Sequence, residues 1–96
     1  MILIPELKFQ KSLKQLVKKN SQLRDKIQEV LMCLEQDPYT PSLKSHKLTG
    51  NLKEYWSCSV AADCRIIFSF QQDLETGESF IKLSDIGSHN DVYKKK

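Results

Sequence analysis

Apolar side chains recur at helical spacing in the first part of the chain. Residues 1–5 form a short apolar run that predicts a first strand, after which Phe9, Leu13, Leu16 and Val17 alternate with lysines. Intervals of three and four residues place these side chains on one face of a helix. The pattern therefore predicts an amphipathic helix whose apolar stripe faces a core.

A second helix is expected directly after the first. Pro5 suits the start of the first helix, and Asn20 interrupts its pattern before Ser21, whose hydroxyl can cap a new helix. Asp37 and Pro38 end the second helix. Its apolar stripe consists of Leu23, Ile27, Val30, Leu31 and Leu34. Two helices so close in sequence predict an antiparallel hairpin.

The second half of the chain is rich in aromatic and β-branched residues, which favour strands. Three strands are expected, over residues 55–60, 65–70 and 79–86. A short turn over residues 61–64 makes the first two strands a hairpin, and the polar residues 72–78 form the next turn. The result is an antiparallel meander.

One strand, two helices and three further strands predict an α+β fold. We expect the helical hairpin to pack on one face of a mostly antiparallel sheet of about four strands, with the other face and its loops free. A chain of 96 residues suffices for one such domain, spanning residues 1–96. Residues 38–54 are expected to form a loop with a brief ordered segment around Leu43 and Leu48.

The composition is that of a soluble globular protein, with 40% hydrophobic and 28% charged residues. No apolar run approaches the roughly 20 residues that span a bilayer, and residues 1–5 lack the basic start of a secretory signal. Three cysteines without metal-ligand spacing favour a reducing compartment. We therefore expect a cytoplasmic protein in which Cys58 and Cys64 are buried and chemically inert, with the basic residues 94–96 as a mobile tail.

Positive charge is concentrated in the first half of the chain. The net charge is only +3, but residues 1–53 carry ten lysines and arginines against five acids. Such asymmetry fits a nucleic acid or an acidic protein partner, although a charge run of this kind is more often a solvated helix face.

The candidate chemistry lies in the second half of the chain. His46 and His89 are the two histidines, and imidazole is the side chain best suited to exchange protons near neutral pH. Asp63, Arg65 and Tyr93 accompany them at strand ends or turns, so that the loop, the hairpin turn and the C-terminal segment could converge on an anionic substrate. Structural alternatives stay open, because loop histidines are often merely exposed.

Three of these candidates have specific structural alternatives. Asp63 is a residue type that commonly shapes hairpin turns. Arg65 could pair with an acid such as Asp85, and Tyr93 could pack its ring against the sheet.

Taken in order, these residues resemble the RelE/ParE superfamily of bacterial toxins from toxin-antitoxin operons. The YafQ-like branch of ribosome-dependent messenger-RNA endonucleases is the most similar, and the resemblance covers nearly the whole chain. It rests on Phe9 with Leu13, Leu34 with Asp37 and Pro38, residues 46–50, Trp56, Asp63 with residues 65–68, and residues 86–89 with Tyr93.

The resemblance implies a catalytic set and a departure from it. The implied set is His46, Asp63, Arg65, His89 and Tyr93, where Arg65 matches a phosphate-binding position of the RelE branch and Tyr93 matches an aromatic residue that stacks near the scissile nucleotide. Ser59 stands where the YafQ-like branch has a further histidine. The site therefore resembles a hybrid of the two branches.

The chemistry implied by the resemblance is attack of an RNA 2′-hydroxyl on the adjacent phosphate, with no metal or cofactor. His46 would act as base and His89 as acid, or the reverse. Arg65 would meet charge on the phosphorane, and Asp63 would orient or tune a histidine.

The resemblance also implies partners: a cognate antitoxin from the same operon, the ribosome and messenger RNA, with operator DNA reached only through the antitoxin and no membrane. The lysines expected to contact RNA or the ribosome are Lys8, Lys11, Lys14, Lys18, Lys44, Lys47 and Lys53. Two alternatives remain: a gyrase-inhibiting toxin of the ParE type, and a catalytically silent member that only binds antitoxin or RNA.

Overall fold

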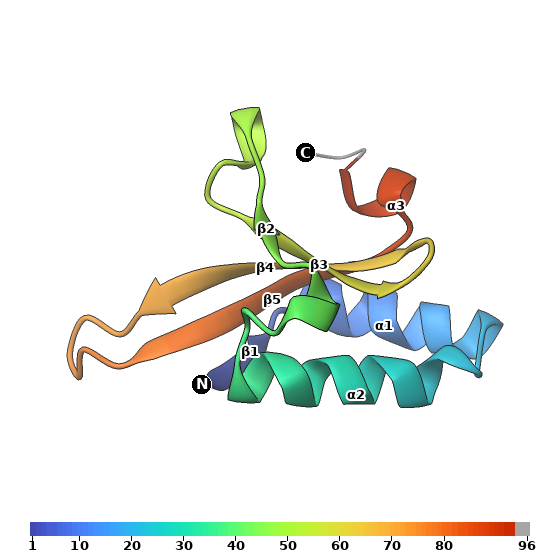
Figure 1. Cartoon of the computed structure of the whole chain (residues 1–96), viewed down its shortest axis with the longest axis horizontal. Helices are drawn as coiled ribbons and strands as arrows, with labels where there is room; N and C mark the ends of the chain where they lie inside the picture. The colour runs from blue at the N-terminus through green and yellow to red at the C-terminus, as the bar shows by residue number, and fades with distance from the viewer. Residues whose placement is uncertain (94–96) are drawn as a thin grey trace.

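Two helices cover one face of a twisted sheet, and shorter segments rise from the opposite face (Figure 1). The computed structural model describes residues 1–93, apart from the side chains at positions 90 and 91. The expected basic tail over residues 94–96 lies outside this description. Within the described residues, no helix is both long and apolar enough to cross a membrane.

The helical hairpin is confirmed, with α1 over Leu7–Lys19 and α2 over Leu23–Gln36. Ser21 does not cap α2, contrary to the prediction. The tight turn instead brings the amide of Leu23 to within 3.0 Å of the Asn20 carbonyl, and the amide of Arg24 to within 3.1 Å of the Ser21 carbonyl. Because backbone carbonyls already accept from these amides, the turn closes without a hydroxyl cap.

Pro5 ends the first strand rather than beginning α1, which corrects a second expectation. It pairs with Leu83 as the last residue of β1, and Glu6 precedes the helix and donates its amide to the Leu83 carbonyl at 2.9 Å. A proline fits here because β1 is an edge strand, where one side of the backbone needs no partner.

The sheet has five strands in the order β1-β5-β4-β3-β2. These are β1 (Ile2–Pro5), β2 (His46–Lys47), β3 (Trp56–Ala61), β4 (Cys64–Gln72) and β5 (Ser79–Gly87). Among the strands of the described residues, only β1 pairs in parallel, with β5. The α+β class and the mostly antiparallel sheet are confirmed, and the extra strand is the two-residue β2.

The loop after α2 contains more order than expected. A 3₁₀ turn, η1, covers Pro41–Leu43, and β2 leads to a second turn, η2, over Gly50–Leu52. The amide of Leu48 donates to the Tyr55 carbonyl at 3.0 Å, so residues 46–55 double back as a projection that we call the arm. Gly50 has φ +65°, a conformation that a side chain would strain.

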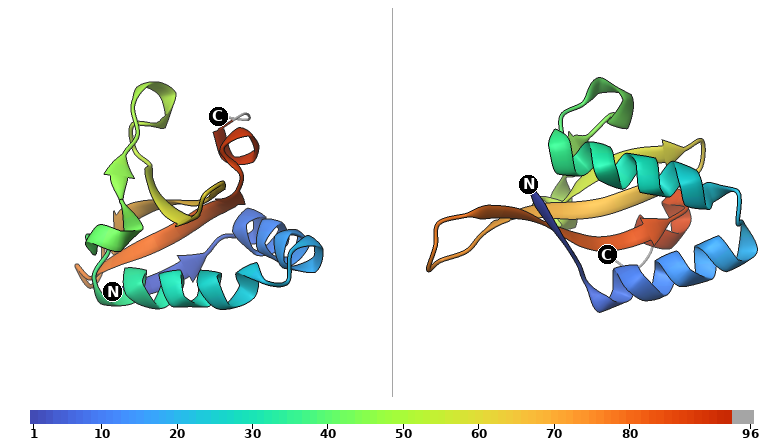
Figure 2. Two further views of the ribbon diagram at one scale, coloured as in Figure 1. Left: turned by 45° about the vertical axis from the view of Figure 1, so that its right-hand side comes forward. Right: turned by 90° about the horizontal axis from the view of Figure 1, so that it is seen from below.

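Five residues are too few for a stable isolated helix, yet α3 (His89–Tyr93) forms after β5. This short helix was not expected from the sequence. It packs against β4 and β5, and Val92 is fully buried. Figure 2 shows the arm and α3 rising from the same face of the sheet, opposite α1 and α2. The face expected to be free is therefore flanked by two projections.

The hydrophobic core lies between the sheet and the helices. It is formed by Phe9, Ile27, Val30, Leu34, Leu43, Cys58, Val60, Cys64, Ile66, Phe68, Ile81, Leu83 and Ile86. The predicted burial of Cys58 and Cys64 is confirmed, and both are free thiols. Burial raises the pKa of the Cys58 thiol to about 12 and also raises the pKa of Cys64. Neither thiol is a nucleophile near neutral pH.

Candidate functional site

The register of the strands places two rows of side chains on the face opposite the helices. Cross-strand partners share a face, and the neighbouring Cys58 and Ile66 point into the helix-side core. One row on the opposite face is therefore Ser59, Arg65 and Gly87, and the next is His46, Ser57 and Ile67. Asp85, the partner of Ile67 on β5, lies beside an irregularity in the pairing, and its carboxylate meets Lys8 of α1 instead.

The turn between β3 and β4 meets the start of α3 at one end of this face. The backbone amide of His89 donates to Asp63 Oδ1 at 3.5 Å. The imidazole of His89 and the ring of Tyr93 lie edge to face, with centroids 4.4 Å apart. Arg65 follows Asp63 by two residues and pairs with Gly87, just before α3. Four of the five expected site residues thus gather here.

Arg65 does not pair with Asp85. Asp85 is 3% exposed, and its Oδ2 lies 3.3 Å from Lys8 Nζ of α1. Arg65 is half-buried, and its Nε is buried without a hydrogen-bond partner among the described residues. A buried donor of this kind is costly unless a ligand or water satisfies it. Arg65 can therefore meet an anion without first breaking an ion pair with Asp85.

His46 stands on the other side of the same face, on the edge strand β2. Its ring is exposed, and Nδ1 lies 3.0 Å from the Lys44 carbonyl oxygen. A carbonyl only accepts, so Nδ1 carries the proton in this contact, and the neutral ring keeps its lone pair on Nε2. The exposed nitrogen is then the one able to accept a proton.

The structure separates His46 from the other four residues. Two strand spacings, about 10 Å, lie between β2 and β4, and no described hydrogen bond or ring contact joins His46 to Asp63, Arg65 or His89. In Figure 2 the arm and α3 stand on either side of the face. A substrate lying across the sheet would pass between the two groups.

Two features of the sheet near the site were not identified from the sequence. Ser57 is paired with His46, and its Oγ is fully buried with no hydrogen-bond partner in the part of the chain described. The ion pair between Lys8 and Asp85 ties α1 to β5. Neither follows from local spacing, because both depend on strand register and helix packing.

The expected basic surface consists of two separate groups. Lys44, Lys47 and Lys53 are exposed on or beside the arm, next to His46. The remaining lysines, Lys8, Lys11, Lys14 and Lys18, lie on α1 in the helical layer. Among the described side chains, no three His, Cys, Asp or Glu residues are close enough to hold a metal ion.

Comparison with solved structures shows the same fold in bacterial toxins. YafQ from E. coli strain BL21(DE3) matches with a TM-score of 0.77 at 18% identity, covering 95% of this chain and 96% of that chain. YafQ in the E. coli DinJ-YafQ complex gives 0.75 at 17%, with 95% and 96% covered. A metal-bound toxin from Helicobacter pylori gives 0.72 at 28%, with 97% and 99% covered.

The family assignment rests on the sequence. A search of the curated proteins found no match. Residues 3–94 match the family model described as the bacterial toxin of type II toxin-antitoxin system, YafQ. Because this match spans nearly the whole chain, the protein belongs to the YafQ family of type II toxin-antitoxin toxins.

Proposed function

We propose that this toxin is a ribosome-dependent endonuclease that cuts messenger RNA without a metal. The observation that carries the proposal is the gathering of Asp63, Arg65, His89 and Tyr93 at one end of an open sheet face, with His46 across from them. This arrangement offers two imidazoles and a cation to a phosphodiester.

Each group has a role in the proposed reaction. Nε2 of His46 accepts the proton of the RNA 2′-hydroxyl, and the resulting oxygen attacks the adjacent phosphorus. The bond from phosphorus to the 5′-oxygen breaks, and His89 donates a proton to that oxygen, leaving a 2′,3′-cyclic phosphate and a 5′-hydroxyl. The two histidine roles could be exchanged.

The remaining residues stabilise and position the reacting groups. Arg65 meets the charge that develops on the phosphorane. Asp63 positions His89 by accepting a hydrogen bond from its backbone amide. Tyr93 lies against the His89 imidazole, where a phenol ring can stack on a nucleotide base.

The proposed partners follow from the family. The E. coli relative is found in a DinJ-YafQ complex, and we propose a cognate antitoxin from the same operon for this chain, with operator DNA contacted only through that antitoxin. The toxin would act in the cytoplasm on translating ribosomes. The exposed lysines of the arm and of α1 would contact RNA phosphates.

The gyrase-inhibiting alternative is less well supported, because a toxin that acts by binding a protein has no need for this combination of imidazoles and a cation. One observation supports a catalytically silent toxin, which is the absence of a histidine at position 59.

The fate of messenger RNA shortly after induction separates these functions. Rapid cleavage indicates the nuclease, whereas a DNA-damage response without cleavage indicates a gyrase poison.

The decisive experiment measures single-turnover cleavage of messenger RNA on purified ribosomes. His46→Ala and His89→Ala should each slow cleavage by about 10²–10⁴-fold, because each removes a proton carrier. Arg65→Ala should lower transition-state stabilisation by about 3 kcal/mol while leaving proton transfer possible.

Thr49→Ala is a matched control, since Thr49 is exposed on the arm and outside the proposed set. Its cleavage rate and ribosome binding should equal those of the unmodified protein. If both histidine variants also cut at the unmodified rate, the catalytic proposal is wrong.

A further inference from the structure

Three aromatic rings form a partly exposed cluster on the helix side of the sheet, just after the C-terminal end of α2. The rings of Trp56 of β3 and Phe70 of β4 lie edge to face, with centroids 5.3 Å apart. The ring of Tyr39 stacks on Phe70 at 5.9 Å and meets Trp56 at 5.8 Å. Tyr39 is 60% exposed, whereas Trp56 and Phe70 are half-buried. We call these three rings the aromatic platform.

The turn after α2 holds Tyr39 in place. Asp37 Oδ1 accepts a hydrogen bond from the backbone amide of Tyr39 at 2.9 Å, and the Thr40 hydroxyl donates to the Asp37 carbonyl at 2.7 Å. Pro38, between them, is buried. A ligand that stacks on a ring already held in place loses less free energy to ordering.

A positively charged hollow adjoins the aromatic platform. Its volume is about 610 Å³, within the range of roughly 300–1,000 Å³ that is usual for ligand sites. It is lined by Lys47, Lys53, Glu54, Trp56, Phe70 and Gln71. Both lysines are exposed, and neither forms an ion pair within the described part of the chain. Two cations against one acid favour an anionic ligand beside the rings.

Strand register connects this hollow to the proposed catalytic face. Lys47 is paired with Trp56, whereas His46 is paired with Ser57. Because successive residues of a strand point to opposite faces, β2 presents His46 to the catalytic face and Lys47 to the hollow. β2 is the last strand of the sheet. An RNA strand bound at His46 would therefore reach the platform by crossing a single edge strand.

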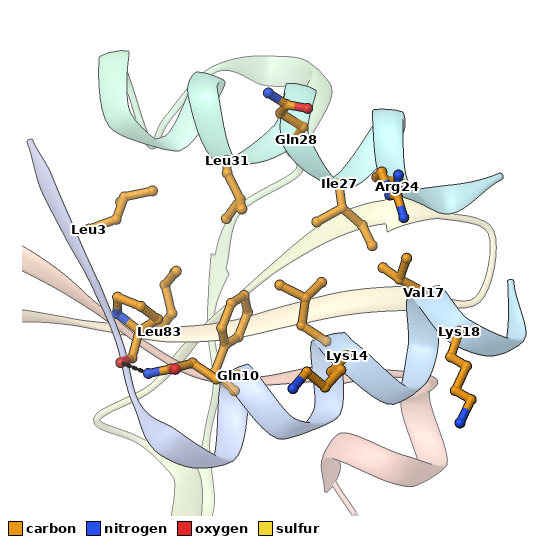
Figure 3. Close-up of a pocket in the computed structure, with 13 residues that line it drawn as sticks. Leu3, Gln10, Lys14, Val17, Lys18, Arg24, Ile27, Gln28, Leu31 and Leu83 are labelled. Carbon is orange, nitrogen blue, oxygen red and sulfur yellow. Dashed lines mark hydrogen bonds between the residues drawn. The ribbon is translucent and has the colours of Figure 1, made fainter. Parts of the chain in front are cut away.

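The groove between α1 and α2 lacks such a surface (Figure 3). The side chains labelled there are aliphatic or polar, and Phe9, the aromatic residue among those that line the groove, is only 2% exposed. A nucleotide base stacks on an accessible ring. Of these two surfaces, only the aromatic platform therefore offers a base a ring on which to stack.

We propose that the aromatic platform stacks an unpaired base of single-stranded RNA, while Lys47 and Lys53 contact the adjoining phosphates. Aromatic rings beside cations are the combination with which proteins bind single strands, and stacking tolerates any sequence because every base has a π face. That this strand is the messenger RNA cut beside His46 rests on the proposed function. The platform holds a neighbouring nucleotide, so binding here does not by itself produce cleavage.

The test uses the fluorescence of Trp56, which is the single tryptophan of the chain. The probe is a single-stranded 2′-O-methyl RNA of about ten nucleotides, which the toxin cannot cut because it has no 2′-hydroxyl. At low salt it should quench Trp56 in a saturable manner. A duplex of the same length should not, because its bases are already stacked. Binding of the single strand without any change in Trp56 emission would overturn the proposal.

Variants of Tyr39 test the stacking itself. Tyr39→Ala should weaken binding of the probe by about tenfold, because it removes the most exposed ring. Tyr39→Phe is the matched control, since it keeps the ring, and its affinity should equal that of the unmodified protein. Equal affinities for Tyr39→Ala and Tyr39→Phe would overturn the proposal. So would a Tyr39→Ala variant that loses affinity for the antitoxin but not for the probe, because the platform would then be a protein-docking surface.

Salt dependence tests the two lysines. Lys47→Gln and Lys53→Gln should each reduce the slope of log affinity against log salt concentration by about 0.7, because each removes one phosphate contact. Lys26→Gln is the matched control, since Lys26 is exposed on α2 and does not line the hollow. Slopes that stay unchanged in both hollow variants would contradict the phosphate contacts.

The binding assay and the cleavage assay separate the two proposals. If the unmodified toxin fails to cut messenger RNA on ribosomes but the probe quenches Trp56, only the nuclease proposal fails. If cleavage is observed and the probe leaves Trp56 unchanged, only the platform proposal fails.

Discussion

At position 59 a serine is paired with Arg65 on the neighbouring strand. Ser59 Oγ donates to the Ala61 carbonyl at a long 3.4 Å, so little holds this side chain in place. The family pattern that this chain resembles has a histidine here. An imidazole at this position would lie beside the cation proposed to meet the phosphorane.

Ser59→His should therefore raise the cleavage rate or shift its pH optimum, because a third group able to exchange protons near neutral pH enters the site. The measurement is the pH profile of single-turnover cleavage on ribosomes. Ser59→Asn is the control, since an amide adds similar polar bulk without titrating. Identical profiles for Ser59→His and the unmodified protein would show that position 59 has no part in proton transfer.

The buried thiol of Cys58 predicts a loss of stability at alkaline pH. Burial raises its pKa from an ordinary value of 9.0 to about 12 in the folded protein. Above pH 9 the unfolded chain releases this proton while the folded protein retains it, so the free energy of unfolding falls by up to about 1.4 kcal/mol per pH unit until pH 12. Below pH 9 the thiol contributes no pH dependence.

The comparison of the unmodified protein with Cys58→Ala isolates this contribution. Denaturant unfolding between pH 8 and pH 10.5, roughly the range that brackets the ordinary pKa, should show a steeper decline for the unmodified protein. If the free energy of unfolding falls equally with pH for both proteins, burial does not disfavour the Cys58 thiolate.

At the scale of elements, the start of α1 is tied to β5 by polar contacts. Ser84 donates its hydroxyl to Glu6 Oε1 at 2.9 Å, and the Lys8 ammonium lies 3.3 Å from the Asp85 carboxylate. Asp85 is buried, whereas the Lys8 side chain is 45% exposed. Lys8 is therefore a structural residue as well as a proposed contact for RNA.

Lys8→Ala should lower the free energy of unfolding by about 1–2 kcal/mol, because it leaves the buried Asp85 unpaired, although the exposure of Lys8 reduces the loss. Lys11→Ala removes the same charge from the same helix, and no ion pair of Lys11 is found among the described residues. It should change stability by less than about 0.5 kcal/mol. Denaturant unfolding of both variants provides the measurement, and equal stabilities would contradict the structural role of Lys8.

At the scale of the whole molecule, the proposed catalytic groups stand on two projections from one sheet face. The arm carries His46, and α3 carries His89 and Tyr93, with the sheet between them (Figure 2). A face of this size offers few contacts to orient a flexible single strand. The ribosome can supply that orientation by holding messenger RNA in place.

Free RNA should therefore be a poor substrate, and expression without the antitoxin should arrest growth by cutting translated messages. The assay compares cleavage of one message, free and bound to ribosomes, at ordinary salt. The lysines should make the ribosome-dependent rate fall as salt increases. Efficient cleavage of free RNA would contradict the ribosome-dependent proposal, and unimpaired growth with good expression would contradict toxicity.

Local patterns of apolar residues were sufficient to predict the long elements of this protein. Each long element contains enough apolar residues at helical or strand spacing to specify its own conformation. These elements are α1, α2, β3, β4 and β5. The resemblance to toxins also pointed to the family, which the family model confirmed. The error at Pro5 arose because pairing with β5 continues through Pro5 to the amide of Glu6, and the error at Ser21 arose because backbone carbonyls satisfy the first amides of α2.

The short elements and the arrangement of the proposed site depend on contacts between distant parts of the chain. The two residues of β2 exist as a strand because β3 offers hydrogen bonds, and α3 is stabilised by burying Val92 against the sheet. Strand register places Arg65 beside Ser59. The packing of α1 on the sheet brings Lys8 to Asp85, so Asp85 pairs with Lys8 and not with Arg65. These contacts join residues distant along the chain, and local sequence patterns carry no information about which distant partner will be adjacent.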